Sequence, residues 1–68
     1  MTTQWVYASG STWVSFDSTA QQIIESLWKR NVATWINCQP FHGMVYIDTS
    51  EMVLHYNNHA YTIARRKF

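Results

Sequence analysis

Cys38 and the three histidines are the residues of this chain whose chemistry could be catalytic or metal-binding. Cys38 and His42 stand four residues apart, a spacing that zinc sites use, and a cysteine beside a histidine base can act as a nucleophile. However, no second cysteine completes a pair of ligands, and His55 and His59 flank a polar turn. No oxyanion-hole turn or orienting acid is evident. We therefore predict neither a metal site nor a catalytic centre, and we expect a domain that is not an enzyme and needs no cofactor.

The chain is short and poor in charge, with 68 residues, 13% of them charged, and a net charge of +1. Such a length predicts one domain, 1–68. A charge of +1 argues against general nucleic-acid binding, which needs a broad basic face. One cysteine cannot form an internal disulfide, and we find no apolar run of about eighteen residues and no leader-like start. We expect an intracellular protein, cytoplasmic or nuclear, that does not bind membranes.

Alternating and helical hydrophobic patterns predict the element order ββαββββ. Asp17 and Ser18 stop the second strand, Ser18 with Gln21 forms a capping-box pattern, and Asn31 is a candidate left-handed C-cap. The expected strands are 4–7, 12–16, 33–38, 44–48, 52–56 and 60–65, and the expected helix is 19–30.

The simplest fold for this order is α+β: a single curved antiparallel sheet, or half-barrel, of about six strands with one helix packed on its concave face. We expect the first and sixth strands to mark the ends of this sheet.

Large aromatic residues are frequent, with four tryptophans, four tyrosines and three phenylalanines. Each can bury about 150–250 Å², so they can fill the core of a small domain. We expect Trp5, Trp13, Trp28 and Trp35 in this core, because aromatics at strand and helix spacing are typically buried. Glu25 lies in the predicted helix. We expect it to be a structural residue, buried or half-buried, whose carboxylate accepts hydrogen bonds from the sheet or from an arginine such as Arg65.

The order of these residues resembles a WWE domain over nearly the whole chain. The matching positions are Trp5-x-Tyr7, Trp13-x-x-Phe16-Asp17, Glu25 in the helix, Tyr46-Ile47-Asp48-x-x-x-Met52 and Ile63-x-Arg65-Arg66. WWE domains are found in ubiquitin ligases and ADP-ribosyltransferases. Several of them bind the iso-ADP-ribose unit of poly(ADP-ribose) at one end of a half-barrel.

The resemblance implies structural roles for Trp5, Trp13 and Glu25. It also implies ligand contacts, for which the candidates are Tyr7, Tyr46, Tyr61 and Arg65. An aromatic ring suits adenine, and an arginine fork suits phosphate oxygens.

The chain departs from the family pattern at several pocket positions. Val45, Leu54 and Tyr61 stand where the family carries a tyrosine, a glutamine and an arginine, and the 10–11 turn lacks a basic residue. Tyr46 is one residue away from the family tyrosine, which in a strand turns the side chain to the other face.

Two functions follow from this comparison with the family. The first is a module within a larger ADP-ribosyltransferase or ubiquitin ligase that binds ADP-ribose or poly(ADP-ribose) weakly. The alternative is a WWE-fold interaction or spacer domain that has lost ligand binding and contacts neighbouring domains or partner proteins.

Overall fold

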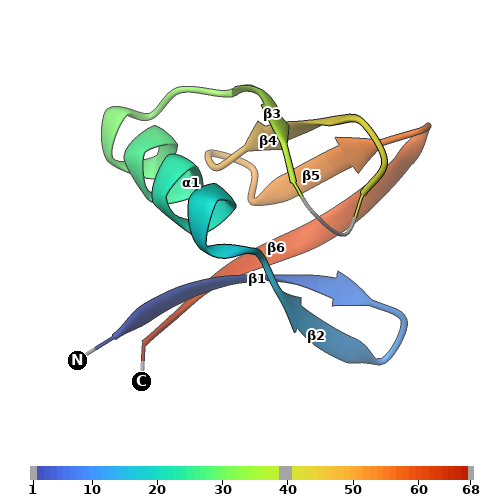
Figure 1. The fold of residues 1–68 in the computed structure, drawn as a ribbon, viewed down its shortest axis with the longest axis horizontal. Helices are drawn as coiled ribbons and strands as arrows, with labels where there is room; N and C mark the ends of the chain where they lie inside the picture. The colour runs from blue at the N-terminus through green and yellow to red at the C-terminus, as the bar shows by residue number, and fades with distance from the viewer. Residues whose placement is uncertain (1, 39–40, 68) are drawn as a thin grey trace.

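A computed structural model describes residues 2–38 and 41–67, and within them six strands and one helix (Figure 1). All six strands belong to one open antiparallel sheet in the order β2-β1-β6-β5-β4-β3. The elements are β1 (Thr3–Ser9), β2 (Thr12–Ser15), α1 (Ser18–Arg30), β3 (Thr34–Asn37), β4 (Met44–Asp48), β5 (Val53–Tyr56) and β6 (His59–Lys67). The predicted α+β class with one helix and one antiparallel sheet is confirmed.

The edges of the sheet are β2 and β3, so the expectation that the first and sixth strands lie at its ends is wrong. β6 is the longest strand and uses both of its edges. Its first half pairs with β5, for example Leu54 with Tyr61, and its second half pairs with β1, for example Trp5 with Arg65. The sequence pattern predicted a strand of only six residues here, which did not suggest that β6 pairs with both β5 and β1.

Helix α1 begins and ends at residues that satisfy its free backbone groups. The Asp17 side chain accepts a hydrogen bond from the Ala20 N–H at 3.3 Å, so Asp17 is the N-cap and the predicted capping box of Ser18 with Gln21 is wrong. The amide of Gln21 is used instead on Trp5 in β1. Asn31 adopts the predicted left-handed conformation, with φ 56° and ψ 48°, and its N–H reaches the last carbonyls of the helix.

Two turns adopt the positive φ that their residues tolerate best. Gly10 connects β1 and β2 with φ 63°, and Asn57 and Asn58 connect β5 and β6 with φ 53° and 67°. The latter pair forms a two-residue hairpin loop between Tyr56 and His59. Part of the predicted turn 39–43 lies outside the described residues, because Gln39 and Pro40 are not among them.

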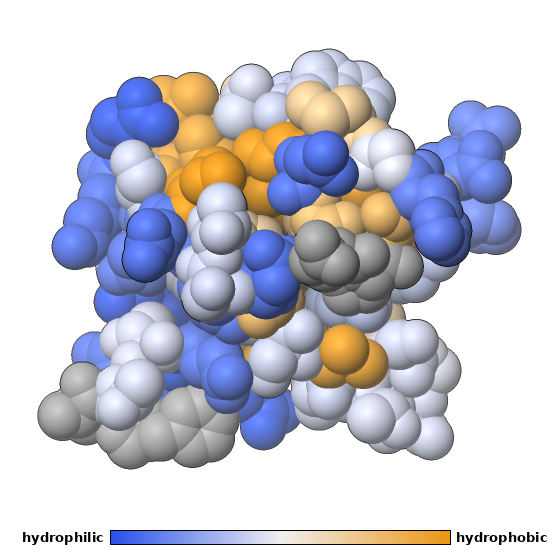
Figure 2. Space-filling model, in the orientation of Figure 1, coloured by the Kyte–Doolittle hydropathy of each residue, from blue (hydrophilic) through white to orange (hydrophobic). Residues whose placement is uncertain are grey.

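The core lies between α1 and the sheet. Helix α1 buries Ala20, Ile24 and Leu27, and it contacts both β1 and β3. The largest side chains that are completely buried are Trp5, Ile24, Ile47, Leu54, Ile63 and Val45. Figure 2 shows one face of the molecule, on which apolar residues reach the surface between polar ones near α1 and β3.

Only Trp5 of the four tryptophans is buried, so the expected core placement of the other three is wrong. Trp13, Trp28 and Trp35 are 42%, 42% and 58% exposed. In β2 the alternation turns Val14 toward the core, and its neighbour Trp13 therefore points to the other face.

Within residues 2–38 and 41–67, no helix is long and apolar enough to cross a membrane. The same part of the chain has no group of three histidine, cysteine or acidic residues that could hold a metal ion.

Candidate functional site

Glu25 joins α1 to the sheet through a hydrogen-bonded network. Its Oε1 atom accepts hydrogen bonds from Trp5 Nε1 at 2.8 Å and from Arg65 Nε at 2.9 Å, and its Oε2 atom accepts one from Arg65 Nη2 at 2.7 Å. The Arg65 guanidinium also lies over the Trp28 ring, 4.2 Å from its centroid, and Trp28 contacts Trp5 edge to face at 6.3 Å. Four side chains from three elements are thereby fixed in one place.

This network makes Arg65 a poor candidate for phosphate binding. Its fork-shaped guanidinium already binds the Glu25 carboxylate with two hydrogen bonds, which is its strongest mode of pairing. Hydrogen bonds from Arg65 and then Trp5 lower the pKa of Glu25 to about 2, despite the opposing effect of burial, and Glu25 raises the pKa of Arg65. The pair is therefore fully ionised near neutral pH, and the charge of Arg65 is largely neutralised.

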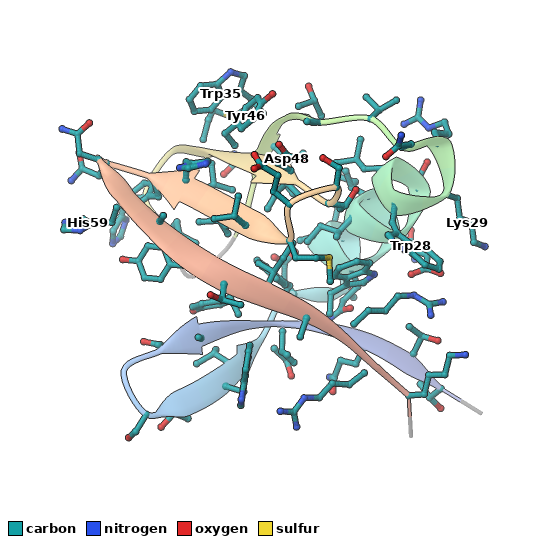
Figure 3. The ribbon with its side chains drawn as sticks, turned by 180° about the vertical axis from the view of Figure 1, so that it is seen from behind. Trp28, Lys29, Trp35, Tyr46, Asp48 and His59 are labelled. Atoms are coloured by element: carbon teal, nitrogen blue, oxygen red, sulfur yellow. The ribbon has the colours of Figure 1, made fainter. Side chains whose placement is uncertain are left out.

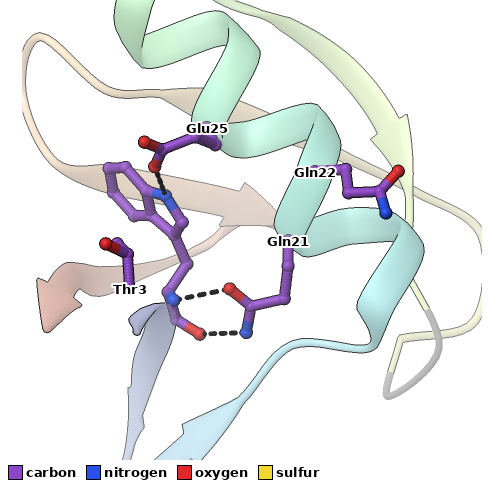
Figure 4. Close-up of a pocket in the computed structure, with 5 residues that line it drawn as sticks. Thr3, Gln21, Gln22 and Glu25 are labelled. Atoms are coloured by element: carbon purple, nitrogen blue, oxygen red, sulfur yellow. Dashed lines mark hydrogen bonds between the residues drawn. The ribbon is translucent and has the colours of Figure 1, made fainter. Parts of the chain in front are cut away.

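A shallow pocket of about 240 Å³ adjoins this network on the α1 side (Figure 4). It is lined by Thr3, Trp5, Gln21, Gln22 and Glu25. The Gln21 amide accepts from the Trp5 N–H at 2.6 Å and donates to the Trp5 carbonyl at 2.8 Å, as if it were one residue of an added strand.

Sequence reasoning missed this pocket and the role of Gln21. Gln21 and Glu25 are four residues apart in a helix, which places two polar side chains over the sheet on the same face. This spacing could have predicted that both side chains form hydrogen bonds with the sheet. Because Trp5 engages both Gln21 and Glu25, the side chains of Thr3 and Gln22 are the other polar groups that line the pocket.

Tyr7 and Tyr61 are the two candidate ligand residues that the structure brings together, with ring centroids 6.2 Å apart. Phe41 fills the space beside them, 5.2 Å from Tyr7 and 5.5 Å from Tyr61. Phe16 packs on Tyr7 at 5.1 Å and Tyr56 packs on Phe41 at 4.9 Å. We call these five rings the inner aromatic cluster. Tyr7 is buried within it.

The chemistry of this cluster is that of a packed core. Burial, followed by the nearby Cys38 and Tyr61, raises the pKa of the Tyr7 phenol. The Tyr56 hydroxyl donates a hydrogen bond to the His42 carbonyl at 2.8 Å, which holds the segment carrying Phe41 against β5. The rings contact one another at tilted or edge-to-face angles, so an adenine would have to separate them to reach the buried Tyr7 ring.

Tyr46 lies on the other face of the sheet, away from Tyr7 and Tyr61. In β4 its neighbours Val45 and Ile47 are completely buried, and the alternation of the strand turns Tyr46 outward. There it pairs across strands with Trp35 and His55. The structure thus separates the four candidate contacts into Tyr7 with Tyr61, Tyr46 outside, and Arg65 in its ion pair.

Cys38 is buried and 2% exposed. Burial, and then the negative charge of Asp17, raises the pKa of its thiol to about 11. At neutral pH the thiol is protonated and therefore a weak nucleophile.

Comparisons of the chain with models of protein families, with curated proteins and with solved structures found no match.

Proposed function

We propose that this chain is a non-catalytic module with the half-barrel architecture of WWE domains and that it acts by contacting other polypeptides. Two features support the architecture. Helix α1 contacts β1 and β3, which stand second and last in the sheet order, so a sheet that curves around the helix is needed to reach both. The ion pair of Glu25 with Arg65 also gives the glutamate of the WWE pattern a structural role.

The inner aromatic cluster is the observation that favours polypeptide contacts over ADP-ribose. Tyr7 and Tyr61, which the resemblance assigns to the ligand, instead pack against Phe41 and against each other through tilted and edge-to-face contacts. Leu54 and Val45 stand at the polar pocket positions of the family and are completely buried. A purine would have to displace packed rings, and it would find no amide at Leu54 to pair with its edge.

Weak binding of ADP-ribose or poly(ADP-ribose) is the second candidate function, and the pairing of Tyr7 with Tyr61 favours it. Tyr7 keeps an aromatic ring at a position that the family uses, and Tyr61, which replaces the family arginine, adds a second ring beside it. In this case the chain would serve a larger ADP-ribosyltransferase or ubiquitin ligase as a low-affinity sensor.

Titration of iso-ADP-ribose into ¹⁵N-labelled protein distinguishes the two functions. We expect no saturable shift of any amide of 2–38 or 41–67, even at millimolar ligand. Saturable shifts centred on Tyr7 and Tyr61, at high micromolar ligand or below, would establish the second function and refute the first.

A further inference from the structure

Three aromatic rings form a row across the outer face of β3, β4 and β5. Trp35 pairs with Tyr46, and Tyr46 pairs with His55, with ring centroids 5.2 Å and 6.3 Å apart. We call these three residues the outer aromatic ladder. Trp35 is 58% exposed, more than any other large hydrophobic residue that the structure describes. Figure 3 shows Trp35 and Tyr46 projecting together from the sheet. More than half of the surface of Trp35 therefore stays open to solvent.

The ladder ends at an edge of the sheet. Among the described strands β3 is last in the order and pairs with β4 alone, and α1 contacts β3 as well. Exposed edges are usually blocked by lysine, proline or a bulge, because their free N–H and C=O groups can pair with another chain. The four residues Thr34–Asn37 carry no charge and no proline. At the opposite edge the guanidinium of Arg66 covers Trp13, 5.1 Å from its ring centroid, whereas no cation covers Trp35 among the contacts of the described residues.

The charge of this region is complementary to a basic partner. Residues 31–64 contain two carboxylates, Asp48 and Glu51, and neither lysine nor arginine. Asp48 lies on the same face of β4 as Tyr46, two residues further along the strand. Its Oδ1 atom accepts hydrogen bonds from the Ser50 N–H at 3.0 Å and the Ser50 hydroxyl at 2.7 Å, which fixes the carboxylate beside the ladder.

We propose that β3 and the outer aromatic ladder bind an extended segment of a partner protein that carries lysine or arginine at alternate positions. The segment would add a strand to the β3 edge, so that backbone hydrogen bonds supply affinity and alternate side chains supply specificity. A basic side chain over Trp35 gains cation–π attraction. Two strand spacings, about 10 Å, separate the added strand from β4. A lysine or arginine side chain of the added strand and the side chain of Asp48 can together span this distance and form an ion pair. This inference rests on the proposed function as an interaction module and names its surface and partner.

The probe is an acetylated, amidated nonapeptide that alternates lysine and valine, and its control alternates glutamate and valine. Both are titrated into ¹⁵N-labelled protein at low and moderate salt. We expect the lysine peptide alone to shift the amides of β3 and β4. Equal effects of both peptides, shifts centred on the β2 edge, or no shifts would overturn the inference.

Variants at Trp35, Trp13 and Asp48 separate this surface from a general loss of structure. Trp35→Ala should weaken peptide binding about tenfold through lost cation–π and packing contacts, while Trp13→Ala, at the other edge, should leave it unchanged. Asp48→Asn keeps an oxygen for the Ser50 hydrogen bonds and should weaken binding about threefold and reduce its salt dependence. Equal losses from Trp13→Ala and Trp35→Ala would refute the assignment.

Three further outcomes would distinguish among the alternatives. If the protein alone forms dimers by light scattering, and Trp35→Ala abolishes them, then a second copy of the chain occupies the edge and the basic partner is wrong. If neither peptide nor iso-ADP-ribose binds, β3 and the outer aromatic ladder are not the binding surface, while the interaction function stands. Tight iso-ADP-ribose binding instead would refute the proposed function itself.

Discussion

Replacing Glu25 by alanine tests whether its network holds α1 to the sheet. The change leaves Trp5 Nε1 without its acceptor in a side chain that is only 1% exposed, and an unpaired buried donor costs about 1–3 kcal/mol. Arg65 also loses its partner but can regain water at the surface. We therefore expect a loss of about 2–3 kcal/mol from the roughly 3–10 kcal/mol that a domain of 68 residues has.

Urea unfolding, followed by far-UV circular dichroism, measures this loss. Glu25→Gln should cost about 1 kcal/mol, because its amide oxygen still accepts one hydrogen bond from Trp5 or Arg65. Gln22→Ala is the control, since it removes an exposed side chain from the same helix and should change stability by less than about 0.5 kcal/mol. If Glu25→Ala unfolds at the same urea concentration as the wild type, the network contributes no stability and the reasoning is wrong.

The same carboxylate makes stability depend on pH. Its pKa falls from an ordinary 4.5 to about 2 in the folded protein, so the unfolded chain binds the proton more readily. The contribution of Glu25 is therefore complete above about pH 5 and is lost as pH falls toward 2. At 1.36 kcal/mol per pKa unit the full shift gives about 3 kcal/mol. Because 24% of the side chain is exposed, screening by water reduces this to about 1–2 kcal/mol. Between pH 5 and 3 the wild type should lose stability faster than Glu25→Gln, and parallel curves would refute the assignment.

Three further substitutions and one reaction distinguish buried from exposed positions. Trp5→Ala should cost about 3–5 kcal/mol and leave the protein largely unfolded, whereas Trp13→Ala should remain folded by circular dichroism; similar melting of the two variants would contradict their placement. Leu54→Gln should destabilise the fold by about 2–4 kcal/mol, because it buries an unpaired amide in place of a packed side chain, and a stable variant would show that the site is less closed than described. Native Cys38 should react with iodoacetamide far more slowly than in urea, and equal rates would show that the thiol is accessible.

Local sequence signals predicted the elements well, because each depends on neighbouring residues. The capping geometry of Asn31 and the positive φ of Gly10 follow directly from residue type. The start of β5 was misplaced by one residue because Met52 has a left-handed φ of 55°, which a methionine seldom adopts and no pattern announces. The sequence did not show whether Asp17 or Ser18 is the N-cap. A capping box at Ser18 needs the side chain of Gln21, and in the structure that side chain is hydrogen-bonded to the Trp5 backbone.

Long-range pairing was harder to predict. The sequence pattern identified β1 and β6 as strands, yet it could not reveal that they pair with each other, because that depends on β6 being long enough for two partners. The resemblance gathered Tyr7, Tyr46, Tyr61 and Arg65 into one site. The structure separates them for two reasons. The alternation of side chains along β4 places Tyr46 on the outer face, and Arg65 is hydrogen-bonded to Glu25.

The aromatic side chains on the two faces of the sheet differ in how closely they pack within the protein. This difference affects where a partner can bind. On the inner face Tyr7, Phe41 and Tyr61 have packed together, so a ligand there gains little beyond what it disrupts. On the outer face more than half of the surface of Trp35 is exposed to water. Burial of that apolar surface by a partner would stabilise the complex by about 25 cal/mol per Å². An association therefore gains more from covering the outer aromatic ladder than from opening the inner aromatic cluster, even before the backbone hydrogen bonds of the β3 edge are added.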